Sequence, residues 1–350
     1  MGDPVEALRG TDLAALGDLA SRLGVESFLL SRLGPGQTRL EPVAARWFAE
    51  LRHRVALVEV NNLMRDEALA GMLSRLEAVG IDFILLKGAA LRLLRPEAAG
   101  RFQCDVDILL RRPDLERAEA VLGELGFGLD ESSRSRDAAL ETHFHFGFER
   151  DGAVVEVHWD VDRATPSGFL DQLWERSLVI HGSGGEARRI LAPEHRLLFG
   201  CIHLSRHGFE EGLRWLADLS LELPLSAEEW ERFVEDGRAW PWRAAHVPLW
   251  MLEVLGAPGL GDALAAEAVH RDGSLRLPER TLLRNLLVHL MMGEDWHGLP
   301  AWRAAKAVRA WLFSHRPLLA VLAENSVSGL GSRSQPAGFP PGSPQRLPEG

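Results

Sequence analysis

Residues 85–110 constrain the fold of this chain most, because two apolar runs there enclose a turn and a pair of acidic residues. The first run ends at Lys87 and Gly88, a helix-forming segment follows, and the second run contains Asp105 and Asp107, separated by a single residue. If the second run is a strand, its period of two places both carboxylates on one face. The pattern therefore predicts a strand that carries two neighbouring carboxylates.

The predicted acidic pair needs a compensating positive charge. Two carboxylates about 4 Å apart repel each other by about 4 kcal/mol at an effective dielectric of about 20. Val106, Ile108 and Leu109 flank the pair and indicate a largely buried strand, where carboxylates tend to mark functional sites rather than a solvated edge. Hard Mg²⁺ binds carboxylate oxygens and keeps open positions for substrate phosphates. The pair therefore indicates metal-assisted phosphoryl or nucleotidyl transfer.

A predicted β-hairpin adds a third carboxylate. Residues 141–150 and 153–160 both alternate between apolar and polar residues, and Asp-Gly joins them, which is a strong hairpin signal. On the second strand Glu156, His158 and Asp160 share one face. If this strand lies beside the strand with the acidic pair, Glu156 completes a cluster of three carboxylates. Such a cluster is the ligand set that a two-metal site needs to clamp attacking and leaving oxygens.

The order of these motifs resembles a known family. Leu-Lys-Gly, then Arg101, then Asp-x-Asp, then Val-Glu-Val-His-Trp is similar to the uncharacterised nucleotidyltransferase family of bacterial biosynthetic clusters, within the DNA polymerase beta-like nucleotidyltransferase superfamily. His203, His207 and the run Arg-Trp-Leu-Ala-Asp-Leu at residues 214–219 resemble the helical region of the family. The resemblance covers residues 50–225, half of the chain.

The resemblance implies a site, a cofactor and substrates. It implies Mg²⁺ or Mn²⁺ as the cofactor, an NTP as one substrate, and an acceptor that is a small molecule, a peptide or RNA. Backbone amides at a glycine turn before a helix can approach a triphosphate, and cationic side chains can neutralise the charge that develops on phosphorus. The implied catalytic metal ligands are Asp105, Asp107 and Glu156, and the implied nucleotide-binding residues are Lys87, Gly88 and Arg101. The accessory residues are His158, His203, His207, Arg214 and Asp218.

Two other interpretations remain open. The phosphate turn reads Gly-Ala where the wider superfamily usually has Gly-Ser or Gly-Gly, which favours a non-catalytic binding or scaffold protein with the same fold. His143 and His145 share a predicted strand face and, together with His158 and Glu156, could instead bind zinc. That arrangement would indicate a zinc-dependent hydrolase.

Two residue pairs lie four residues apart on predicted helices. His203 and His207 have the spacing of a metalloprotease helix, but Leu204 stands where that motif requires glutamate, so the motif fails. Arg214 and Asp218 have the spacing of an ion pair on a helix surface. The histidines are therefore expected to face a cleft or an interface, and the second pair to be a surface ion pair or part of the site.

Composition bounds the remaining possibilities. The formal net charge of -11, from 39 basic and 50 acidic residues, disfavours a dedicated nucleic-acid binder. Cys104 and Cys201 form no metal or redox motif, which favours a reducing, cytoplasmic setting. No apolar signal segment or membrane-spanning run is present, and nothing in the sequence indicates an oligomeric state.

The chain is predicted to have an α+β fold, in which a small mixed sheet is flanked by helices. Four segments are expected: an N-terminal helical segment at 1–78, a nucleotidyltransferase core at 79–162, a helical C-terminal region at 163–323, and a disordered tail at 324–350 that is rich in Gly, Pro and Ser. Residues 81–86 are expected to form a strand, and residues 169–323 are read as helical throughout, with breaks near 181–185 and at prolines.

Overall fold

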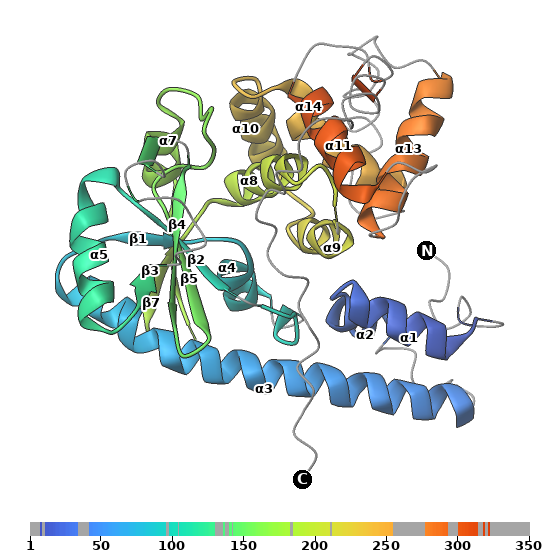
Figure 1. Ribbon diagram of the computed structural model, residues 1–350, viewed down its shortest axis with the longest axis horizontal. Helices are drawn as coiled ribbons and strands as arrows, with labels where there is room; N and C mark the ends of the chain where they lie inside the picture. Colours follow the sequence, from blue (N-terminus) through green and yellow to red (C-terminus); the bar gives the residue numbers. More distant parts are fainter. Residues whose placement is uncertain are drawn as a thin grey trace.

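A mixed β-sheet lies at the centre of the computed structural model (Figure 1). The structure describes residues 8, 11–33, 42–95, 98–103, 105–129, 136, 140–141, 143–182, 185–210, 212–254, 277–292, 300–313, 318 and 321–322. Within these residues the sheet has seven strands in the order β3-β4-β5-β2-β1-β7-β6. Their bounds are Phe83–Leu85 (β1), Asp105–Leu110 (β2), Gly128–Leu129 (β3), His145–Arg150 (β4), Ala153–His158 (β5), Leu178–His181 (β6) and Ala187–Ile190 (β7).

The strand pairing is parallel at two places and antiparallel elsewhere. The strand β2 runs parallel to β5, and β1 runs parallel to β7. The pairs β1–β2, β3–β4, β4–β5 and β6–β7 are antiparallel. The predicted hairpin is confirmed as β4–β5, with Asp151 and Gly152 at positive φ in its turn. The sheet and its flanking helices confirm the predicted α+β class.

Helices cover both faces of the sheet. The N-terminal helices are α1 (Leu13–Arg22), α2 (Glu26–Leu33) and α3 (Pro42–Ala78), and the helices between strands are α4 (Lys87–Leu94), the 3₁₀ turn η4 (Arg112–Asp114), α5 (Leu115–Glu124) and α7 (Phe169–Glu175). The C-terminal helices are α8 (Pro193–Arg206), α9 (Leu213–Leu221), α10 (Ala227–Gly237), α11 (Trp242–Val254), α13 (Leu277–Met291) and α14 (Ala301–Leu312). None of the helices among the described residues combines the length and the apolar character needed to span a bilayer.

Two hydrophobic clusters meet at the sheet because strand residues alternate between its faces. Val106 and Ile108 of β2 point to the side on which α3 and α5 pack. Ile84 of β1 and Leu109 of β2 point to the opposite side and join the cluster built by α7 to α14. Asp107 lies on β2 between Val106 and Ile108, so its side chain shares the face of Leu109 and is directed toward the C-terminal helices.

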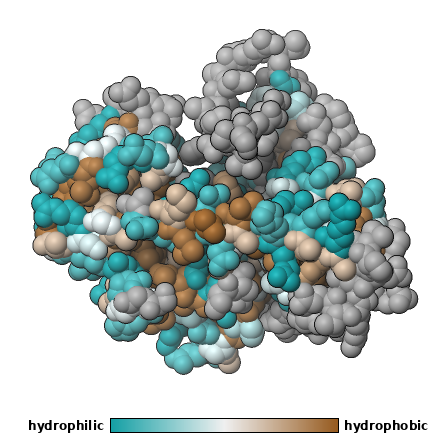
Figure 2. Space-filling view, turned by 90° about the horizontal axis from the view of Figure 1, so that it is seen from below, coloured by the Kyte–Doolittle hydropathy of each residue, from teal (hydrophilic) through white to brown (hydrophobic). Residues whose placement is uncertain are grey.

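The helix α3 packs through one face. Leu51 packs with the N-terminal helices, and Leu76 packs against the sheet. In Figure 2, which shows the side along which α3 runs, apolar patches lie among polar ones. The exposed apolar residues of α3 are Leu57, Val60, Leu63 and Met64. The single packed face of α3 therefore connects the N-terminal helices to the sheet.

One helical prediction is wrong. The strands β6 and β7 pair antiparallel where helix was expected, and Ile190 of β7 pairs with Leu85 of β1, so these strands extend the central sheet. Val179 and Ile180 favour strands, and a glycine-rich turn follows them. Gly185 has a φ of +85° and donates its backbone N–H to the carbonyl of Gly182. The predicted disordered tail at 324–350 and Cys104 lie outside the described residues, and the predicted domain boundaries stay predictions.

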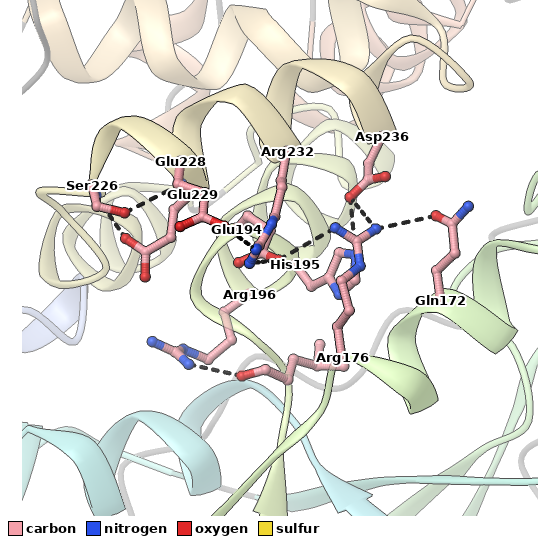
Figure 3. A network of polar contacts seen from close by, with 11 residues as sticks. Gln172, Arg176, Glu194, His195, Arg196, Ser226, Glu228, Glu229, Arg232 and Asp236 are labelled. Carbon is pink, nitrogen blue, oxygen red and sulfur yellow. Dashed lines mark hydrogen bonds and ion pairs between the residues drawn. The ribbon is translucent and has the colours of Figure 1, made fainter.

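A buried polar network connects α7, α8 and α10 (Figure 3). Arg176, which follows α7, donates from Nη2 to Asp236 Oδ2 over 2.7 Å, and the Nη1 of Arg176 lies 3.4 Å from Glu194 Oε1. His195 Nε2 lies 3.1 Å from the same Asp236 oxygen. Burial raises the pKa of Asp236, but the hydrogen bonds from His195 and Arg176 outweigh it and lower the pKa. The network fixes the helices that stand over the carboxylate face of the sheet.

Candidate active site

The parallel pairing of β2 with β5 brings the three predicted carboxylates together. In the register of this pair, Asp107 lies beside Glu156 and Leu109 lies beside His158. One carboxylate oxygen from each of Asp105, Asp107 and Glu156 can be chosen so that all three lie within 4.8 Å of one another. The set offers only hard oxygen donors, which Mg²⁺ and Mn²⁺ prefer, so the residues fit a divalent cation.

The electrostatics of the cluster also fit a cation. Burial and the charges of Asp107 and Glu156 raise the pKa of Asp105 to about 6, and the charges of Lys87 and Arg101 offset this only in part. Burial also raises the pKa of Glu156, but Lys87 and a hydrogen bond from His158 outweigh it and hold this pKa well below its usual range. Asp105 is therefore the carboxylate whose negative charge is least compensated.

Lys87 supplies positive charge inside the cluster. Its Nζ lies 2.5 Å from Asp107 Oδ1 and 3.4 Å from Glu156 Oε2. Burial lowers the pKa of Lys87, but the charges of Asp107, Glu156 and Asp105 outweigh it and raise the pKa. The backbone φ of Lys87 is 44°, in the left-handed region that residues other than glycine rarely adopt. Such strained positions cluster at functional sites because the surrounding contacts must hold them in place.

Two histidines border the cluster on the side of β4 and β5. His158 is buried, and its Nε2–H donates to Asp107 Oδ1 over 3.0 Å, with Glu156 Oε2 at 3.3 Å. Burial lowers the pKa of His158, but the hydrogen bonds to both carboxylates outweigh it and raise the pKa. His145 Nε2 lies 4.0 Å from Glu156 Oε1, and burial together with the charge of His158 lowers the pKa of His145 to about 4.

These histidines form a second group that could hold a metal ion. Ligand atoms of His145, Glu156 and His158 all lie within 4.8 Å of one another. The predicted zinc alternative also used His143, which is exposed and does not belong to this group. The two groups share Glu156, so the histidine group is continuous with the carboxylate cluster.

A cavity of about 120 Å³ opens on the carboxylate cluster. Its sheet side is lined by Lys87, Gly88, Asp105 and Asp107, and its other wall comes from α8 and α9. On that wall the ring of His203 stacks on Trp215, with ring centroids 3.8 Å apart and planes 12° apart. Burial lowers the pKa of His203 well below its usual range, so this ring is neutral. The cavity therefore has a charged floor and a partly aromatic wall.

Arg101 connects the sheet side of the cavity to α9. Its Nε donates to both carboxylate oxygens of Asp218, over 2.7 and 2.9 Å, and its Nη2 donates to Oδ2 over 2.6 Å. Of the two alternatives for Arg214 and Asp218, the surface ion pair is therefore wrong, because Asp218 pairs with Arg101 across the fold and both residues line the cavity. A Cβ added to Gly88 would lie 2.5 Å from Arg101 Nη1, so glycine allows the guanidinium to approach α4.

Several residues that line or support the cavity were not predicted. Arg196 of α8 donates from Nε to Glu222 Oε2 over 2.8 Å, and both line the cavity. Gln103 donates from Nε2 to the backbone carbonyl of Asp105 over 2.6 Å, which fixes the start of β2. The predicted accessory residue His207 does not line the cavity, although its ring lies 4.6 Å from that of Trp215. No sequence motif marks Arg196 and Glu222, because 26 residues separate them.

Comparisons with known proteins give distant similarities to solved structures and a match to one family model. A comparison with curated proteins finds no match. One similar solved structure is the antibiotic-resistance factor ANT(2'')-Ia, with 13% identity and a TM-score of 0.32 over 60% of this chain and 98% of that chain. Another is an antigenic nucleotidyltransferase-like protein from Paracoccidioides brasiliensis, with 14% identity and a TM-score of 0.27 over 66% of this chain and 92% of that chain.

The family assignment depends on a family model rather than on these distant structures. Residues 10–252 match the model described as "Uncharacterised nucleotidyltransferase". This range includes the turn at Lys87 and Gly88, the acidic pair on β2, Glu156 on β5, and both helices of the cavity wall. The match confirms the resemblance inferred from the motif order. The chain belongs to the uncharacterised nucleotidyltransferase family.

Proposed function

We propose that this protein is a Mg²⁺- or Mn²⁺-dependent nucleotidyltransferase that moves a nucleoside monophosphate from an NTP to an acceptor hydroxyl or phosphate. Family membership supports nucleotidyl transfer. The observation that carries the proposal is the register of β2 against β5, which sets Asp107 beside Glu156, while Asp105 lines the cavity with its charge only partly compensated by Lys87 and Arg101.

Each residue has a distinct part in the proposed reaction. Asp105, Asp107 and Glu156 would hold the divalent ion, which when bound supplies Lewis-acid stabilisation of the attacking and leaving oxygens. Glu156 stays ionised and would polarise the O–H bond of the acceptor. Lys87 would neutralise charge on the transferred phosphorus, and the first turn of α4 at Gly88 would offer backbone N–H groups to the phosphates.

The proposed nucleotidyl transfer forms one bond to phosphorus and breaks another. The acceptor oxygen bonds to the α-phosphorus, the bond from that phosphorus to the bridging oxygen breaks, and pyrophosphate leaves. The acceptor proton passes to the carboxylate cluster or to water. The neutral, partly aromatic wall formed by His203 and Trp215 would hold an organic part of a substrate.

The transfer step can be tested with two labelled forms of each NTP. Purified protein is incubated with Mg²⁺, candidate acceptors, and NTP labelled on either the α- or the γ-phosphate. The proposal predicts acceptor labelling from the α-labelled NTP alone, and its loss in Asp105→Asn. Asp151→Asn is the matched control, because Asp151 is an exposed carboxylate in the β4–β5 turn. Labelling from the γ-phosphate would instead show phosphoryl transfer.

A second candidate function is zinc-dependent hydrolysis. The group of His145, Glu156 and His158 favours it, because imidazole and carboxylate are common zinc ligands. Metal analysis after dialysis separates the two candidates, since a zinc enzyme would retain one equivalent of zinc and lose it in His145→Ala. If the protein binds NTP with Mg²⁺ but labels no acceptor, the non-catalytic binding function inferred from the Gly-Ala turn becomes the better account.

A further inference from the structure

The charged residues of the cavity are not fully paired. Four cations and four carboxylates line it: Lys87, Arg101, Arg196, Arg214, Asp105, Asp107, Asp218 and Glu222. Lys87 contacts Asp107, Arg101 contacts Asp218, and Arg196 contacts Glu222. In each pair the two residues come from different segments of the chain. Within the described part of the chain, the side chains of Asp105 and Arg214 have neither an ion-pair nor a hydrogen-bond partner.

Arg214 occupies a defined place on the cavity wall. It lies in the first turn of α9, next to Trp215 and one turn before Asp218. A Cβ added to Gly24, in the turn between α1 and α2, would lie 3.3 Å from the Cδ and 3.8 Å from the Nη1 of Arg214, so this turn packs against both the stem and the guanidinium. Its Nε is buried, and no hydrogen-bond acceptor among the described residues reaches it. A guanidinium held in this way retains its charge but loses part of its hydration.

The two unpaired groups differ in sign and in position. Asp105 lies on the sheet side of the cavity, and Arg214 lies on the helical wall. A ligand that complements both must offer positive charge to Asp105 and negative charge to Arg214. A metal-bound polyphosphate has this distribution, because its cation meets carboxylates while its remaining oxygens stay anionic. Arginine suits such oxygens because its planar fork donates two parallel hydrogen bonds.

We propose that Arg214 binds the terminal phosphates of the NTP, and that Arg101 instead positions α9 through Asp218. The inference rests on the proposed function, and it assigns the triphosphate to a residue on the helical wall. Arg101 would have to leave a bidentate carboxylate before it could bind phosphate, whereas Arg214 has no such bond to break. The role in triphosphate binding predicted for Arg101 therefore passes to Arg214.

The test compares nucleotides that carry the terminal phosphates with nucleotides that lack them. Calorimetry with Mg²⁺ measures binding of the four NTPs and the four nucleoside monophosphates to wild type, Arg214→Met and Arg214→Lys. Loss of one charge-assisted pair corresponds to roughly a 10- to 100-fold change in affinity. We expect Arg214→Met to weaken NTP binding by about that factor and to leave monophosphate binding within about two-fold. Arg214→Lys should recover part of the loss.

The control is Arg309→Met, because Arg309 is an exposed arginine of α14 that does not line the cavity. Equal NTP affinity in Arg214→Met, Arg309→Met and wild type would overturn the inference and leave the proposed function standing. A parallel titration with inorganic tripolyphosphate tests Arg214 even if wild type binds no NTP. Its readout is the thermal stability of the protein. If tripolyphosphate stabilises wild type but not Arg214→Met, the result supports an anion site at Arg214. Equal stabilisation of both proteins refutes the site.

Discussion

Substitution of Gly88 by alanine should have opposite effects in two backgrounds. In wild type the new Cβ would lie 2.5 Å from Arg101 Nη1 and 3.2 Å from its Cζ. Arg101 cannot easily move away, because three N–H···O contacts hold it on Asp218. Overpacking of this kind costs about 1–3 kcal/mol, whereas replacing glycine by alanine in a helix gains up to about 1 kcal/mol. We therefore expect Gly88→Ala to destabilise wild type by about 1–2 kcal/mol.

In an Arg101→Ala background the clash is absent and only the helix propensity remains. There Gly88→Ala should be neutral or should stabilise the protein by up to about 1 kcal/mol. The coupling between the two positions is then about 2 kcal/mol, well above the error of additivity. Urea denaturation of the wild type, both single variants and the double variant measures the free energies of unfolding. An equal cost of Gly88→Ala in both backgrounds would show that Arg101 does not lie against α4 as described.

Three further predictions concern Lys87, Asp236 and Cys201. Lys87→Met should lower the free energy of unfolding by about 3 kcal/mol or more, because it leaves Asp107 and Glu156 buried without their cation. The control Lys306→Met, at an exposed lysine, should change the free energy of unfolding little. Urea denaturation measures both changes. Because the pKa of Asp236 is lowered by folding, its contribution to stability is complete above its unfolded pKa of about 4 and is lost as the pH falls through the folded value. Asp236→Asn should therefore flatten the dependence of unfolding free energy on pH below about 4, measured against wild type in the same buffers. The buried thiol of Cys201, whose pKa burial raises, should react with a thiol reagent in native protein only as slowly as the protein unfolds, whereas fast labelling in mass spectrometry would contradict its burial.

Only part of the geometry of the carboxylate cluster could be inferred from local sequence signals. The period of two on β2 fixes which side chains share a face, and the Asp-Gly turn fixes the register of β4 against β5. The parallel pairing of β2 with β5 could only be assumed as a condition, because 49 residues separate Asp107 from Glu156 and no local rule connects them. The structure meets that condition.

The ion pairs on the far wall of the cavity could not be inferred in the same way, although the resemblance named His203, Arg214 and Asp218 as accessory residues. Arg101 and Asp218 are 117 residues apart, and the spacing of Arg214 and Asp218 pointed to a local pair instead. Only the tertiary arrangement shows which of several plausible partners a charged side chain takes. The hairpin β6–β7 was missed for another reason. Its strands are short and only Ile190 in them is buried, whereas β2 and β5 are buried along almost their whole length.

Calorimetric titration of each NTP, with and without Mg²⁺, on wild type and on Asp105→Asn/Asp107→Asn tests the central claim most directly. The carboxylate cluster predicts binding that requires Mg²⁺ in wild type and disappears in the double variant, while circular dichroism shows both proteins folded. Mg²⁺-dependent binding of equal strength in the double variant would contradict the account, because the nucleotide would then be held without the acidic pair of β2.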